Sequence, residues 1–167
     1  MKGSYKYIKK EVFIAFVIYS LGIALGVLIY KNKTLDMVPQ RLGIAAIFLN
    51  NIKTAFLILI VGLITVGIGS ALLMLINGAV LGGAVMGVVN AYSFKPIISG
   101  ILPHFMFETI GLAIFTAISF ESLKLLLNVI TKREMQKVYL KKDLFLIFCG
   151  TVFLLLAAII EGTVSRV

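Results

Sequence analysis

The sequence predicts an all-α integral membrane protein, in which a single domain over residues 1–167 forms a compact bundle of about five transmembrane helices. Three observations support this fold class. Hydrophobic residues make up 60% of the chain and charged residues only 14%, whereas a soluble domain has about 25% charged residues. Several apolar stretches approach or exceed 18 residues, the length that crosses a bilayer. The Lys and Arg residues gather in a few predicted loops, as they do in membrane proteins.

The first predicted span covers residues 12–30, and a segment containing Asp36 and Pro39 interrupts the apolar pattern after it. Residues 41–53 then place apolar side chains on one side of a helix and polar side chains on the other. This pattern predicts a helix that lies at the membrane interface and leads into the next span.

The apolar run over residues 54–91 is too long for one span. As one helix it would be about 57 Å long, whereas the hydrocarbon core is about 30 Å thick. Asn77-Gly78 is the clearest turn, because both residues tolerate the left-handed conformation that ends a helix. We therefore expect a second span at 54–76 and a third at 78–92. The third would be short or irregular: either buried backbone around residues 93–100 completes it, or it is re-entrant.

The fourth predicted span runs from near Pro103 to about Asn128, and the fifth covers residues 144–162. Five spans with a cytoplasmic N-terminus place ten Lys and Arg inside and six outside, and a re-entrant third segment would reverse that count. Because basic residues favour the cytoplasmic side, five spans are preferred. Basic loops beside an anionic leaflet then account for the net charge of +9 without any nucleic acid.

Small residues predict how the helices pack, because helices in a bilayer associate through close contact and a few hydrogen bonds. GxxxG pairs occur once in the first span and twice in the segment NGAVLGGAVMG, so the third span is expected to be the central helix. The glycines indicate either packing within one chain or the seam of a homodimer. The predicted packing and turn residues are Gly22, Gly26, Asn77, Gly78, Gly82, Gly83, Gly87 and Pro103.

Titratable residues enter the fourth span. His104, the only histidine, and Glu108 are four residues apart and share one helix face. Such side chains are costly inside a membrane and usually mark a functional site or a wet cavity. In the inner half, Glu121 is expected to pair with Lys124. The polar residues expected to gather near the outer ends of the spans are Asn50, Asn51, Asn90, His104, Glu108 and Glu161.

Three interpretations of this outer cluster stay open. The first is a structural group whose hydrogen bonds fix helix register. The second is a site for a ligand, a lipid head group or a proton. The third is a metal site formed by His104, Glu108 and Glu161, which carry ligand types that zinc or a harder cation accepts. No HExxH motif, second histidine or Ser-His-Asp set is evident, so we predict no catalytic residues and no cofactor.

Four motifs occur in order along the chain: FLNNIKTAF before a span, INGAVLGG in the next, LPHFMFETIG at the start of the fourth, and LLLAAIIEGTV at the end of the last. As an ordered set they resemble the stage II sporulation protein M family of multi-pass membrane proteins, over about residues 10–165. The family usually has glycine after the Pro-His pair, where this chain has Phe105. The resemblance implies a role in assembly, because the sporulation members help to build an engulfment complex with cell-wall hydrolases. The wider family includes organisms that do not sporulate.

Abundant packing motifs without a complete catalytic set lead us to expect a non-enzymatic scaffold or assembly partner, a multi-pass protein of the cell membrane. The alternative is a transporter or channel that moves a small solute, an ion or a lipid through the outer cluster. An intramembrane metalloenzyme is a third hypothesis. The expected partners are membrane lipids, together with either a second copy in a homodimer or another membrane protein.

Overall fold

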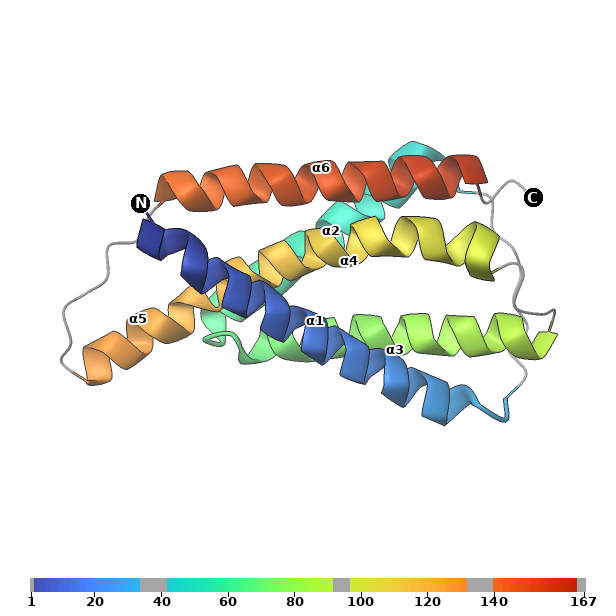
Figure 1. The fold of residues 1–167 in the computed structure, drawn as a ribbon, viewed down its shortest axis with the longest axis horizontal. Helices are drawn as coiled ribbons and strands as arrows, with labels where there is room; N and C mark the ends of the chain where they lie inside the picture. The colour runs from blue at the N-terminus through green and yellow to red at the C-terminus, as the bar shows by residue number, and fades with distance from the viewer. Residues whose placement is uncertain (1, 34–41, 92–96, 132–139, 165–167) are drawn as a thin grey trace.

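The computed structural model describes residues 2–33, 42–91, 97–131 and 140–164, and in these ranges the regular structure is helical (Figure 1). The helices are α1 (Lys2–Tyr30), α2 (Ile44–Ile64), α3 (Ile68–Ala91), the π-helical turn η1 (Ile97–Ile101), α4 (Leu102–Ser119), α5 (Glu121–Ile130) and α6 (Leu140–Val164).

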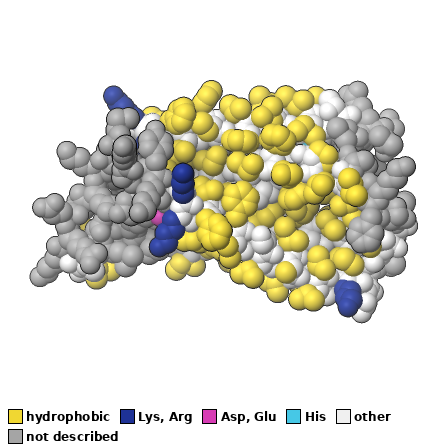
Figure 2. Space-filling view, in the orientation of Figure 1, with side chains coloured by type: hydrophobic (Ala, Val, Ile, Leu, Met, Phe, Trp, Pro, Cys, Tyr) yellow, Lys and Arg dark blue, Asp and Glu magenta, His cyan; other side chains and the backbone are white. Residues whose placement is uncertain are grey.

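Five helical segments are long and apolar enough to cross a membrane, which confirms the predicted fold class. They are Ile8–Tyr30, Ile44–Ile64, Ile68–Ala91, Leu102–Ser119 and Lys141–Thr163. Successive spans run back and forth, so that α1 begins at one end of the bundle and α6 ends at the other (Figure 1). We call these the inner and outer ends, following the predicted orientation, which itself stays a prediction. Figure 2 shows a hydrophobic band between them, with Lys and Arg side chains toward the ends.

The long apolar run turns at Thr65–Gly67, so the predicted turn at Asn77-Gly78 was wrong. Val66 has a φ of 56° and Gly67 a φ of 88°. The Gly67 N–H donates to the Gly62 carbonyl at 2.6 Å, the bond that closes a helix end by a left-handed residue. The Thr65 hydroxyl joins the two helices, because it donates to the Val61 carbonyl and accepts from the Gly69 N–H.

This turn corrects three expected boundaries. The interfacial helix expected at 41–53 is, from Ile44 onward, the first half of the α2 span. Asn77-Gly78 lies inside α3, where the Asn77 side chain donates to the Leu73 carbonyl at 3.0 Å and so stays within the helix. The third span is a regular helix of 24 residues, neither short nor irregular.

Tertiary contacts hold the turn in place. The Ser119 hydroxyl of α4 donates to the Ser70 hydroxyl at 2.7 Å, and Ser70 donates to the Gly67 carbonyl at 2.8 Å. Both serines are fully buried. Any Cβ at Gly67 would meet the Phe120 ring at 2.7 Å. The left-handed Val66 is unfavourable in isolation, because a β-branched residue rarely adopts that conformation, so these contacts from α4 and its C-cap are needed to maintain it.

Glycines bring the backbones of α1 and α3 into direct contact. A Cβ at Gly22 or Gly26 would overlap the carbonyl oxygens of Leu75 or Ala79 on α3. In return, a Cβ at Gly78 or Gly82 would overlap carbonyl oxygens of α1. We call these four glycines the α1–α3 seam. Packing within one chain therefore accounts for two of the three predicted GxxxG pairs.

The third pair lies further along α3. Gly83 packs against the Tyr30 ring near the outer end of α1, and Gly87 is buried.

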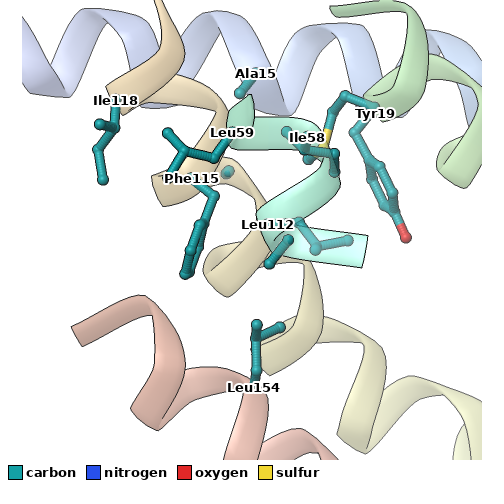
Figure 3. Close-up of a cluster of buried hydrophobic side chains, with 11 residues drawn as sticks. Ala15, Tyr19, Ile58, Leu59, Leu112, Phe115, Ile118 and Leu154 are labelled. Carbon is teal, nitrogen blue, oxygen red and sulfur yellow. The ribbon is translucent and has the colours of Figure 1, made fainter. Parts of the chain in front are cut away.

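The central helix is α4, and the prediction that the third span would be central was wrong. Half of the α4 span (50%) is buried inside the protein, compared with 22–28% of each other span. The small residues of α3 make close contact with one neighbour, α1, whereas α4 has neighbours on several sides. All five spans contribute to the buried core, which consists of Ala15, Tyr19, Ala55, Ile58, Leu59, Met74, Leu112, Ala113, Phe115, Ile118 and Leu154 (Figure 3).

The fourth span ends earlier and the fifth begins earlier than the sequence predicted. Alpha-4 begins with Pro103 in its first turn, as expected, and ends at Ser119. After Phe120 the separate helix α5 carries residues that were assigned to the span. Alpha-6 begins at Leu140 and so includes Lys142 and Asp143.

We expect the substitution Gly82→Ala to destabilise the protein by about 2 kcal/mol, the usual range for overpacking a tight contact. Its Cβ meets a backbone carbonyl, which moves only if α1 and α3 separate. The matched control is Gly43→Ala, where an added Cβ has nothing within 4 Å. Reversible unfolding in detergent micelles measures both, and equal stabilities for the two variants would contradict the seam.

We expect Val66→Asn to stabilise the protein by about 1 kcal/mol, because asparagine tolerates the left-handed conformation better than a β-branched residue does. Val66→Ile keeps the β-branch and should give no gain. The same unfolding measurement compares them, and an Asn variant no more stable than the Ile variant would refute the observed turn.

Candidate functional site

His104 and Glu161 meet at the outer end of the bundle. The first turn of α4 supplies His104 and the last turn of α6 supplies Glu161, because the two helices are antiparallel neighbours. The His104 Nε2 and Glu161 Oε2 atoms are 4.0 Å apart, and the side chains are 14% and 32% exposed. The pair is an ion pair when the imidazole is protonated, and both side chains are partly exposed at the surface of the bundle.

Glu108 extends this pair inward by one helical turn. Its carboxyl group lies close enough to Glu161 for the two carboxyl groups to interact electrostatically. Below it, the side chains of Tyr19 from α1 and Thr109 approach one another and are both buried. The Thr109 hydroxyl also donates to the Phe105 carbonyl at 2.8 Å. His104, Glu108 and Glu161 thus form a group that we call the outer site.

None of the three asparagines of the expected cluster has a described contact with the outer site. Asn90 is exposed and donates toward the carbonyls of Tyr30, Lys31 and Lys33, with its shortest contact at 3.1 Å. It therefore ties the end of α3 to the end of α1. Asn50 points outward from α2 and is exposed.

Asn51 is buried within the bundle. It is only 5% exposed, and its Nδ2 atom has no hydrogen-bond partner among the described residues. Contacts of Phe56 with Phe115 and of Gly62 with Ser119 fix the register of α2 against α4. This register places Asn51 at about the depth of Glu108. Both asparagines lie deeper than the sequence predicted, because α2 begins at Ile44.

The outer site offers few ligands for a metal. Within the described ranges, no three His, Cys, Asp or Glu side chains are arranged so that they could hold a metal ion. His104, Glu108 and Glu161 therefore do not form a three-ligand set. Their chemistry is that of two carboxyl groups and one imidazole, which exchange protons or bind a cation or hydrogen-bond donor.

A second charged group, at the inner end, was not predicted. Lys142 of α6 donates to the Glu121 carboxylate at 2.5 Å, and its Nζ atom lies 3.5 Å from Asp143. Sequence reasoning paired Glu121 with Lys124, whose side chain lies outside the described residues. The sequence feature that could have indicated this charged group is the segment KKD, which comes just before the last apolar stretch. The contact links the start of α5 to the start of α6.

A carboxylate of α1 is also buried in the inner half of the bundle. Glu11 is only 6% exposed. It directly follows Lys9 and Lys10 in the sequence and was not among the residues singled out from the sequence. Its position on the buried side of α1 follows from helical spacing to Ala15 and Tyr19, which are both in the core.

We expect Lys142 and Glu121 to be coupled by about 1 kcal/mol in a double-mutant cycle, since both side chains are about four-fifths buried. The cycle uses Lys142→Met, Glu121→Gln and the double variant, with unfolding in micelles as the measurement. The coupling should fall as salt is added. Additive effects of the two substitutions would show that the contact contributes nothing to stability.

Comparison with known proteins supports the resemblance seen in the motifs. The family model described as stage II sporulation protein M matches residues 15–166, nearly the whole chain. No curated protein and no solved structure matches it. The match includes the first span from residue 15 onward and the other four spans whole, together with the outer site and the α1–α3 seam. The chain is therefore a multi-pass membrane protein that belongs to the stage II sporulation protein M family.

Proposed function

We propose that the protein is a non-enzymatic scaffold of the cell membrane that holds partner membrane proteins against the lipid-facing sides of its spans. The observation that carries this proposal is the filled core beneath the outer site. Leu112, Phe115 and Leu154 are fully buried there, and Figure 3 shows them between α4, α2 and α6. Apolar side chains thus occupy the space between the outer site and the inner end.

The packing of the bundle suits a rigid support. The α1–α3 seam locks two spans by backbone contact, and the buried Ser70–Ser119 hydrogen bond fixes the turn between α2 and α3 against α4. In this reading the outer site sets the register of α4 against α6. The lipid-facing sides of the spans, rather than an internal passage, would be the surfaces that partners and lipids contact.

A transporter or channel is the second candidate, and one observation favours it. Two carboxyl groups and an imidazole lie together within membrane-spanning helices, where ionisable residues commonly mark an ion or proton pathway. Such a protein would need the core below Glu108 to open during its cycle.

Flux through proteoliposomes distinguishes the two. We expect vesicles that contain the purified protein to pass protons, Na⁺ and K⁺ no faster than protein-free vesicles, because the core below the outer site is packed. Glu108→Gln, which keeps the shape of the side chain, should leave both this background rate and the unfolding midpoint unchanged. Flux that the wild type supports and a folded Glu108→Gln variant abolishes would replace the scaffold with the transporter.

A further inference from the structure

Lys53 lies at the middle of a membrane span. It stands nine residues after the start of α2 at Ile44 and eleven before its end at Ile64. At 1.5 Å per residue these separations are about 14 Å and about 17 Å. The long side chain of a lysine reaches the membrane surface readily only from near a helix end. Its ammonium group therefore belongs to the membrane interior.

The side chain of Lys53 faces away from the bundle. It is exposed, whereas Asn51 and Ala55, two residues away on either side, are buried. Two residues correspond to about 200° around a helix, so Lys53 is on the opposite side from the core. The same outward face carries exposed Leu49, Asn50, Leu57 and Ile60. We call these five residues the Lys53 face.

Lys53 has no counter-charge in the described part of the chain. The ion pairs there join His104 to Glu161 and Lys142 to its two carboxylate neighbours. Ionisable residues inside membrane spans almost always face the bundle interior or pair with another group. A lysine at the middle of a span that faces outward therefore indicates a surface that a polar group of a partner covers.

We propose that the Lys53 face binds a transmembrane helix of another protein, which presents an Asp or Glu side chain at mid-membrane depth. The carboxylate would pair with Lys53, and the apolar residues of the face would contact the same helix. Asn50, one turn away, adds an amide that can hydrogen-bond to the partner. This inference deepens the proposed scaffold role by naming the class of partner, and it rests on that role.

A second copy of this chain fits the face less well. A two-fold contact through the face would place the two Lys53 side chains near one another. The carboxylates that the structure describes in or beside the spans (Glu11, Glu108, Glu121, Asp143 and Glu161) are buried or half-buried, so none is presented on the outward surface as the face requires. The net charge of +9 also favours an acidic partner over self-association.

The experiment measures binding of model helices to the intact protein in neutral phosphatidylcholine vesicles by energy transfer. One alanine-leucine transmembrane peptide carries a single Glu at its midpoint, and the matched peptide carries Gln there. We expect the Glu peptide to bind about tenfold more tightly than the Gln peptide, a difference of about 1.4 kcal/mol. Lys53→Met should abolish this preference, and Lys53→Arg should retain it.

Lys31→Met is the matched control, because Lys31 is exposed but lies just beyond the end of α1, and its loss should leave the preference intact. Unfolding midpoints confirm that each variant is folded. Four results would overturn the proposal: equal binding of the two peptides, a preference that survives Lys53→Met, binding that appears only with anionic lipid, or self-association that Lys53→Met removes. Ion flux is a separate readout, so a transporter would be recognised whichever way peptide binding turns out.

Discussion

The turn between α2 and α3 sets the depth of the residues on these two helices. The hydrocarbon core of a bilayer is about 30 Å thick, so the apolar run after Ile44 has to reverse direction once. The position of this reversal decides which residues of the run lie in the membrane interior. Reversal at Thr65–Gly67 brings Asn50, Asn51 and Lys53 into the first half of α2 as membrane-embedded residues. The same reversal aligns Gly78 and Gly82 with the backbone of α1.

The bundle handles its few polar groups in two different ways. Hydroxyl groups at Ser70, Ser119 and Thr116 donate to nearby carbonyls or to one another, so they add contacts without leaving unmet hydrogen bonds. Charged groups are concentrated near the two ends, where His104 meets Glu161 and Lys142 meets Glu121. Lys53 follows neither pattern, because it faces outward from the middle of α2.

Hydropathy was sufficient to predict that there are five spans, but it did not give the bounds of the second and third, which lie in one apolar run. The turn could not be predicted locally: Asn77-Gly78 is the stronger signal in isolation, and Val66 is a poor residue for a left-handed position. The position of the turn depends on contacts from Ser119 and Phe120, which are distant in sequence. The approach of His104 and Glu108 to Glu161 follows from helical spacing and the order of the spans. The inner group around Lys142 was missed because charged residues before an apolar stretch usually lie in solvent.

The position of the turn is tested most directly by the depth of spin labels in a bilayer. Single cysteines replace Val66 and Val80 in a Cys149→Ser background, and power saturation with oxygen and a water-soluble nickel chelate reports the depth of each label. The account predicts that the label at 66 is reached by the nickel chelate and that the label at 80 is reached by oxygen near the bilayer centre. A water-exposed label at 80 with a deeply buried label at 66 would place the turn at Asn77-Gly78 and contradict the account, together with the depth assigned to Lys53.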